Sequence, residues 1–309
     1  MEIVNTEVPV TSRSCEAMLD ALVARYPFCS TEIVTWTAFS RPVRALTIGG
    51  GPRRVLYTAA HHANEWITAL VLLKFIEEYA AAIEEKGNIF GIPAQRIQKN
   101  TTIYLVPMVD PDGVDLVTGA IPPGSDAYLA AAEIAAAFPA IAFPAGWKAN
   151  LLGVDLNLQY PAGWLQAREI KFSQGYTRPA PRDYVGRAPL NQRESRGLAD
   201  YTQRIDPVLV LAFHSQGEEI YWQFEDIEIP GARLLGEEFA RLSGYALTET
   251  PENSAYAGYK DWFIRYFRRP GYTIEVGRGE NPLPLSQFPQ IYRENLGILT
   301  TAATGLPAQ

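Results

Sequence analysis

Histidine and cysteine are scarce in this sequence, and the chain has neither a long hydrophobic run nor an excess of basic charge. Its 309 residues include three histidines and two cysteines, and the formal net charge is −7. No block of like charge is present, which argues against a nucleic-acid partner and against binding to an anionic membrane surface. No apolar run reaches the roughly 18 residues that a transmembrane helix requires.

The start of the chain lacks the features of a secretory signal. Residues 1–5 contain no basic segment and lead into no apolar one, so we expect a cytoplasmic protein. Cys15 and Cys29 could pair in an oxidising compartment, but two free thiols are the expectation for a chain without a secretion signal.

Strand and helix patterns alternate along the chain and predict an α/β fold. The length allows one large domain or two small ones, and since no linker or repeat is present we expect a single domain over 1–309. Strands are predicted at 32–37, 43–48, 54–59, 101–109, 208–213, 219–222 and 272–276. Helices are predicted within 1–30 and at 67–79, 123–138, 192–205, 234–242, 256–267 and 286–301. This order indicates a mixed, mostly parallel sheet flanked by helices, with a long irregular segment at 139–190 that is expected to be functional.

The three histidines all lie at predicted strand ends. His61 and His62 follow strand 54–59, and His214 follows strand 208–213. Glu65 lies three residues after His62 at the start of the next helix, so both side chains can be directed at one point. Imidazole and carboxylate are zinc ligands, and a catalytic zinc site uses three protein ligands with one position left for water. His62, Glu65 and His214 fit that number, although ordinary structural histidines remain the alternative.

Glu275 is a carboxylate on the otherwise apolar strand 272–276. A buried glutamate costs several kcal/mol unless it is paired or functional. Zinc-dependent hydrolysis needs a base for the water and a positive group for the developing oxyanion, and Glu275 is the candidate base. The alternative is a surface carboxylate or an ion pair with Arg278.

Four segments taken together resemble the zinc metallocarboxypeptidase family. They are His62-Ala63-Asn64-Glu65-Trp66, Gly153-Val154-Asp155-Leu156-Asn157, Phe213-His214-Ser215 and Thr273-Ile274-Glu275-Val276, in the order found in that family. The resemblance implies one α/β domain with a mixed eight-stranded sheet, and one Zn²⁺ held by His62, Glu65 and His214. It also implies that Glu275 is the general base. Lys148 stands where the family usually has an arginine that polarises the scissile carbonyl; lysine keeps the charge but loses the two-pronged geometry.

One departure from the family pattern bears on the substrate. In its exopeptidases an arginine follows the residue equivalent to Asn157, and the two hold the substrate's C-terminal carboxylate; here Leu158 follows. A closer resemblance is to the branch that cleaves the γ-D-glutamyl-meso-diaminopimelate bond of bacterial wall peptides. The segments Trp147-Lys148-Ala149-Asn150, Asp155-Leu156-Asn157-Leu158-Gln159-Tyr160-Pro161 and Gly258-Tyr259-Lys260-Asp261-Trp262 carry this likeness. Because the chain shows no wall-binding repeat, we expect it to process wall fragments inside the cell.

The resemblance also suggests residues for an acidic, muropeptide-like substrate. Lys260 and Arg278 are the candidate cations, and Asn157 is a further candidate contact. Tyr256 is the candidate for the family's mobile tyrosine, with Tyr259 as the alternative. Asp155 is expected to accept a hydrogen bond from a zinc-binding histidine, and His61 is expected to be structural.

Three other functions are compatible with the same motifs. An ordinary zinc carboxypeptidase would need another cation in place of the missing arginine. A zinc deacylase of N-acyl amino acids would need a tighter pocket. A wall-peptide-binding pseudoenzyme is disfavoured, because candidates for all three ligands and for the base are present.

Overall fold

An eight-stranded mixed sheet forms the centre of the molecule. The computed structural model describes residues 2–305. The strands lie in the order β1 (Cys29–Trp36), β2 (Pro42–Gly49), β6 (Thr101–Val106), β3 (Arg53–Ala59), β7 (Leu209–His214), β10 (Gly271–Glu275), β8 (Glu219–Tyr221) and β9 (Ala246–Thr248). Four of the seven neighbouring pairs are parallel, including all those between β6, β3, β7 and β10. The predicted α/β fold class is therefore confirmed.

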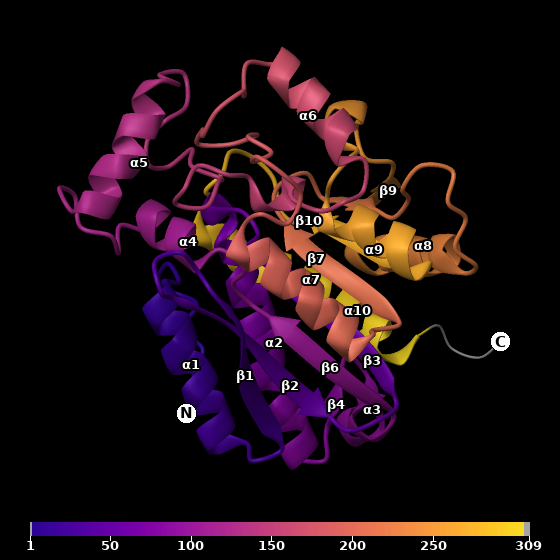
Figure 1. Cartoon of the computed structure of the whole chain (residues 1–309). Helices are drawn as coiled ribbons and strands as arrows, with labels where there is room; N and C mark the ends of the chain where they lie inside the picture. Colours follow the sequence, from indigo (N-terminus) through magenta and orange to yellow (C-terminus); the bar gives the residue numbers. More distant parts are fainter. Residues whose placement is uncertain (1, 306–309) are drawn as a thin grey trace.

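Helices cover both faces of the sheet, which explains why its central strands are apolar throughout. Along β3, Val55 and Tyr57 face one hydrophobic cluster, whereas Leu56 faces another. The first face is covered by α1 (Ser12–Arg25), α2 (Ile67–Glu84), α3 (Ala94–Asn100), α8 (Ala232–Ser243) and α10 (Phe288–Thr304). The other face is covered by α7 (Arg193–Ile205) and α9 (Tyr259–Phe267), which lie in front of the sheet in Figure 1.

The chain between β6 and α7 lies over the end of the sheet towards which β7 and β10 point (Figure 1). It contains α4 (Pro111–Val117), α5 (Asp126–Ala136) and α6 (Trp164–Ser173). A separate two-stranded hairpin is formed by β4 (Asn88–Ile89) and β5 (Ile92–Pro93). The long segment that the sequence marks as irregular is thus placed at the carboxyl ends of the central strands, where α/β folds bind ligands.

Several elements differ from the sequence-based expectations. Strand β6 ends at Val106 rather than at residue 109, and helix α4 follows where the sequence suggested no helix. Asp110 caps this helix by accepting a hydrogen bond from the Gly113 amide at 3.0 Å, and Pro111 occupies its first turn, so a turn-like sequence also starts a helix. Helix α6 lies inside the segment expected to be irregular, α9 begins at Tyr259 rather than at residue 256, and α3 and β9 have no counterpart in the prediction.

Two expectations about the whole chain concern membranes and thiols. None of the helices within residues 2–305 is long and apolar enough to cross a membrane. Cys15 and Cys29 are buried, unpaired thiols, and burial raises the pKa of each to about 12. Neither thiol is therefore a reactive thiolate near neutral pH.

Candidate functional site

The site is built where three neighbouring parallel strands end. His62 follows the end of β3, while His214 is the last residue of β7 and Glu275 is the last residue of β10. His214 and Glu275 are register partners, and the amide of Val276 donates to the carbonyl of His214 at 2.8 Å. Residues far apart in the sequence are therefore brought together by the sheet itself.

The structure brings His62, Glu65 and His214 together with their ligand atoms converging. Nδ1 of His62 lies 2.9 Å from Oε1 of Glu65, and Nδ1 of His214 lies 2.9 Å from Oε2 of the same carboxylate. The two Nδ1 atoms are 3.2 Å apart. All three side chains are buried, and they form the one group of His, Cys, Asp or Glu residues in the described chain that could hold a metal ion.

These distances fit a tetrahedral zinc ion. Zinc binds nitrogen and oxygen at about 2.0–2.2 Å, so two of its ligands in a tetrahedron lie roughly 3.4 Å apart. The observed separations differ from this by a few tenths of an ångström. Two imidazoles and one carboxylate are also the donor set that catalytic zinc sites use, with a fourth position for water.

Asp155 supports the arrangement from outside the ligand set. Its Oδ1 lies 3.1 Å from Nε2 of His62, so this imidazole can donate one N–H to Asp155 while Nδ1 points at the metal position. Burial would lower the pKa of His62, but the carboxylates of Glu65 and Asp155 raise it to about 9. The same negative charge that favours an imidazolium favours a bound divalent cation.

Glu275 lies beside the ligands without a hydrogen-bond partner for its carboxylate among residues 2–305. Burial, together with the negative charge of Glu65, raises its pKa to about 8. A carboxylate whose pKa approaches neutrality can both take up and release a proton, as a general acid–base residue must.

Lys148 supplies positive charge at the same point. Its Nζ lies 3.2 Å from Oε1 of Glu65, and its backbone carbonyl accepts from the amide of Ala63 at 3.0 Å. Burial opposes the charged form, but nearby carboxylates led by Glu65 raise the pKa of Lys148 overall. Lys148 therefore places a positive charge beside the carboxylate of Glu65, and its role in polarising a carbonyl stays a prediction.

The structure distinguishes the two tyrosine candidates. Tyr259 is fully buried, and its hydroxyl is 2.8 Å from that of Thr202, so it is a core residue of α9. Tyr256 is only partly buried and packs edge-on against Phe224. Asn157 accepts a hydrogen bond from the Tyr259 amide at 3.0 Å and so joins the loop after Asp155 to the start of α9.

The two predicted substrate cations already have carboxylate partners. Nζ of Lys260 is 2.5 Å from Oδ1 of Asp261 and donates to the carbonyl of Gln223 at 2.6 Å, and the side chain is only 3% exposed. Arg278 is 74% exposed and pairs with Glu218 at 2.6 Å. Their roles in substrate binding stay predictions, but neither charge is free in the described structure.

Within the irregular segment 139–190, which was expected to be functional, residues 181–183 contact the site, although none of these three residues was singled out from the sequence. The carbonyl of Pro181 accepts from the amide of Lys148 at 2.8 Å, and the amide of Asp183 donates to Oδ2 of Asp155 at 3.3 Å. The two neighbours of Arg182 in the chain are therefore hydrogen-bonded to Lys148 and to Asp155. No spacing or periodicity marks it in the sequence, because it is one of several arginines in a segment without a repeating pattern.

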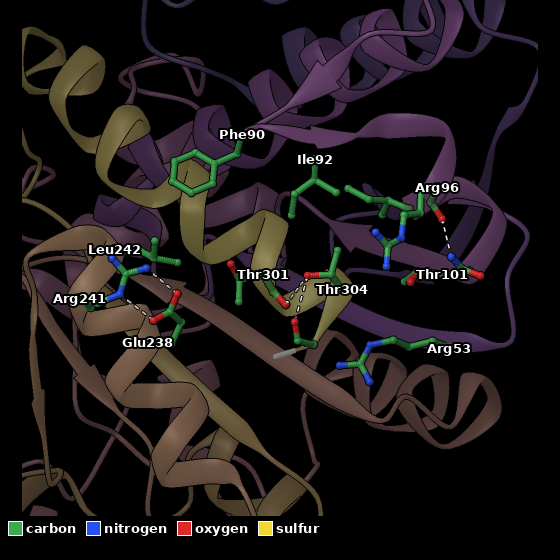
Figure 2. Close-up of a pocket in the computed structure, with 13 residues that line it drawn as sticks. Arg53, Phe90, Ile92, Arg96, Thr101, Glu238, Arg241, Leu242, Thr301 and Thr304 are labelled. Atoms are coloured by element: carbon green, nitrogen blue, oxygen red, sulfur yellow. Dashed lines mark hydrogen bonds and ion pairs between the residues drawn. The ribbon is translucent and has the colours of Figure 1, made fainter. Parts of the chain in front are cut away.

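A cavity of about 540 Å³ lies elsewhere on the molecule (Figure 2). It is lined by Arg53 and Thr101, the first residues of β3 and β6, and by Thr304 at the end of α10. These are the amino ends of the strands, so the cavity lies at the opposite end of β3 from His62. It takes no part in the ligand cluster.

Comparison with known proteins identifies the family. The family model described as zinc carboxypeptidase matches residues 15–297. The chain belongs to the zinc carboxypeptidase family. This membership confirms the predicted family, and the family's dependence on zinc agrees with the ligand cluster of His62, Glu65 and His214.

Two related sequences match this family member over most of its length. It is 44% identical over 277 residues to gamma-D-glutamyl-L-diamino acid endopeptidase 1 of Lysinibacillus sphaericus, covering 90% of this chain and 68% of the relative. It is 37% identical over 290 residues to an uncharacterized protein of Bacillus subtilis (strain 168), covering 93% and 75% of the two chains.

Solved structures support the fold of this metallopeptidase. Carboxypeptidase A from Helicoverpa armigera matches with a TM-score of 0.73 and 16% identity, over 97% of this chain and 75% of that one. A murein-tripeptide amidase from Escherichia coli O157 matches with a TM-score of 0.56 and 18% identity, over 91% and 94%. At these identities the likeness shows the fold alone.

Proposed function

We propose that this protein uses one zinc ion to hydrolyse the γ-D-glutamyl–meso-diaminopimelate bond of bacterial wall peptides. The observation that carries the proposal is the convergence of His62, Glu65 and His214 beside Glu275 and Lys148. The 44% identity to a gamma-D-glutamyl-L-diamino acid endopeptidase supports the choice of bond. The substrate would be a small acidic peptide.

The protein's own residues account for the proton transfers. Zinc, when bound, supplies a Lewis acid that activates water and polarises a carbonyl. As the water oxygen bonds to the amide carbon, Glu275 takes up a proton, and the raised pKa of this carboxyl suits that task. Lys148 faces the oxyanion that develops on the carbonyl oxygen. The carbon–nitrogen bond then breaks, and Glu275 gives its proton to the leaving amine.

Leu158 argues against ordinary carboxypeptidase activity. Its side chain is 7% exposed and packs in a hydrophobic cluster with Ala167, Val185 and Ala257. It therefore offers no charge to a C-terminal carboxylate at the position where the family's exopeptidases use arginine. A substrate with its carboxylates placed elsewhere is the better match.

The test uses purified protein whose zinc content is measured by elemental analysis. L-Ala-γ-D-Glu-meso-diaminopimelate is added, and products are followed by mass spectrometry with and without a chelator. We expect about one zinc per chain and release of diaminopimelate, which chelation abolishes and added zinc restores.

Two other results would change the conclusion in different ways. Stoichiometric zinc without cleavage would keep the metal site and reject the substrate; N-acyl amino acids and C-terminal peptides would then be assayed. Absence of zinc binding after reconstitution would reject the ligand assignment and leave a peptide-binding protein as the alternative.

A further inference from the structure

Residues 181–183 form a short loop that is fixed to the site at both ends. The carbonyl of Pro181 accepts hydrogen bonds from the amides of Lys148 and Ala149 at 2.8 and 2.9 Å. Two residues later, the amide of Asp183 donates to Asp155, which in turn contacts His62. The backbone that carries Arg182 is therefore held by the residues that surround the metal position.

The conformation of this loop is one that side-chain-bearing residues rarely adopt. Asp183 has a φ of 66°, in the left-handed region. Such a conformation is costly for a residue other than glycine, although aspartate tolerates it better than most. The hydrogen bonds at both ends of the loop maintain it, so the direction in which Arg182 leaves the backbone is preorganised.

The charge of Arg182 is only partly compensated. Its Nε donates to Oδ2 of Asp183 at 2.6 Å, whereas its two terminal nitrogens have no hydrogen-bond partner among residues 2–305. Asp183 is shared, because its other oxygen lies 2.7 Å from Nζ of Lys171. One carboxylate thus faces two cations, and the Arg182 side chain is 42% exposed, so an anion from solution can reach its terminal nitrogens.

The other cations at or near the site are engaged. Lys148 faces Glu65, Lys260 is buried against Asp261, and Arg278 pairs with Glu218. A guanidinium with two free parallel donors is also the group best suited to a carboxylate, because it can form two hydrogen bonds at once.

We propose that the terminal nitrogens of Arg182 bind the α-carboxylate of the D-glutamyl residue in the substrate. This assignment rests on the proposed function, which places the scissile carbonyl next to Lys148. In a γ-linked glutamyl peptide the α-carboxylate is free, and the three carbons Cγ, Cβ and Cα separate it from the scissile carbonyl carbon, on the acyl side. Arg182 would therefore select substrates whose acyl residue carries a free carboxylate at this separation, as the γ-linked D-glutamyl residue does.

The experiment compares two substrates that differ only at that carboxylate. One is L-Ala-γ-D-Glu-meso-diaminopimelate, and the other is the same tripeptide with the glutamyl α-carboxylate replaced by a carboxamide, L-Ala-D-isoglutaminyl-meso-diaminopimelate. kcat/KM is measured for both with the zinc-loaded wild type, Arg182→Gln, Arg182→Lys and Arg187→Gln. Arg187 is a matched control, because it is exposed on the same segment and makes no ion pair in the described chain.

We expect the wild type to prefer the carboxylate substrate by roughly 10- to 100-fold, as a charge-assisted pair of hydrogen bonds implies. Arg182→Gln should lose most of this preference by slowing on the carboxylate substrate alone, Arg182→Lys should keep part of it, and Arg187→Gln should keep all of it. Thermal unfolding and zinc content, measured for each variant, control for damage to the fold.

Different failures point to different parts of the argument. A wild-type preference that Arg182→Gln leaves intact, or equal losses on both substrates, would overturn the role of Arg182 while the proposed function stands. Equal kcat/KM values of the wild type for the carboxylate and carboxamide substrates would also overturn the role of Arg182. Failure of the zinc-loaded wild type to cleave either peptide would reject the proposed function and this assignment with it.

Discussion

Asp155 connects three parts of the site through one carboxylate. Its Oδ1 contacts Nε2 of His62 and accepts from the amide of Asn157 at 3.1 Å, and its Oδ2 accepts from the amide of Asp183. Burial alone would raise the pKa of Asp155, but the positive charges of His62 and Lys148 lower it below its usual value. The residue therefore stays ionised and orients the imidazole of His62.

Replacing Asp155 by asparagine should weaken zinc binding. The change removes the charge that favours donation from Nε2 of His62 but keeps the shape of the side chain. We expect zinc affinity to fall roughly 10- to 100-fold, measured by competition with a chromophoric chelator. Asp183→Asn is the control, because Asp183 contacts no histidine, and it should leave the affinity unchanged. Equal losses in both variants would mean that general disruption of the loop is the cause.

Replacing Glu275 by glutamine should abolish most turnover without loss of metal. Glutamine has the size of the carboxylate but cannot take up a proton, and Glu275 is not among the three ligands. We expect kcat to fall by roughly 10²- to 10⁴-fold while zinc content, measured by elemental analysis, stays at the wild-type value. Near wild-type kcat in this variant would exclude Glu275 as the base.

The same substitution should stabilise the metal-free protein at alkaline pH. The pKa of Glu275 is about 8 when folded, above its value of 4.5 for the free side chain, so the folded state favours the protonated form. The stability that the protonated carboxyl gives the folded state is fully present below pH 4.5. It is lost as the pH rises from 4.5 through about 8, because the carboxyl ionises more readily in the unfolded chain. Metal-free Glu275→Gln should therefore unfold at higher urea concentration than the metal-free wild type at pH 9, and the difference should shrink towards pH 5. A constant difference over that range would contradict the assigned pKa.

At the scale of elements, α6 begins in contact with Tyr256. Gly163, which precedes the helix, has a φ of 71°, and a Cβ atom at this position would lie 2.5 Å from Cδ1 of Tyr256. Only glycine allows both the backbone conformation and the close approach of the ring. The position of Tyr256 is thus coupled to the start of α6.

Gly163→Ala should alter catalysis more than stability. The new methyl group displaces Tyr256, whereas the left-handed conformation costs about 1 kcal/mol. If Tyr256 contacts substrate, KM should rise several-fold in steady-state kinetics. Gly175→Ala is the matched control, because Gly175 lies after the same helix with a φ of 95° and a methyl group at that position would meet open space. Equal kinetic effects in both variants would exclude a specific role for the Tyr256 contact.

Strands were easier to predict than the segments between them. The runs that became β3, β7 and β10 are apolar because both faces of the sheet are buried, and this pattern is visible in the sequence. Helix α6 was not predicted, because the residue before it is a glycine that offers no capping side chain and because the helix buries few residues. Its position is set by contacts with distant parts of the chain.

At the scale of the whole molecule, the convergence of His62, Glu65 and His214 could be predicted from the sequence, but the partners of the nearby cations could not. His62 and His214 stand out because histidine is rare and both follow apolar strands. The charges of Lys260 and Arg278 looked available in the sequence, yet each meets a carboxylate partner in the structure. The sequence does not indicate that the carboxylate of Asp183 pairs with both Lys171 and Arg182. This sharing leaves the charge of Arg182 only partly compensated.

Removing zinc should lower the thermal stability of the entire protein. The ion binds a site formed by segments that are separated in the unfolded chain, so it stabilises the folded state by about 2.7 kcal/mol at free zinc 100-fold above its Kd. We expect the Tm to fall by roughly 5 °C on chelation, measured by differential scanning calorimetry. His214→Ala should show no such zinc-dependent shift, and an equal shift in that variant would place the stabilising metal elsewhere.

The pairing of Glu275 with His214 across β10 and β7 also limits how the chain length can vary. The distance between Glu275 and His214 is set by the pairing of two parallel strands, and not by the long connection between them. That connection can gain or lose surface residues in related proteins without changing the distance. A single inserted residue between Gly271 and Glu275 would instead turn the carboxylate to the opposite face of the sheet. Insertions and deletions should therefore be frequent between the two strands and absent within β10.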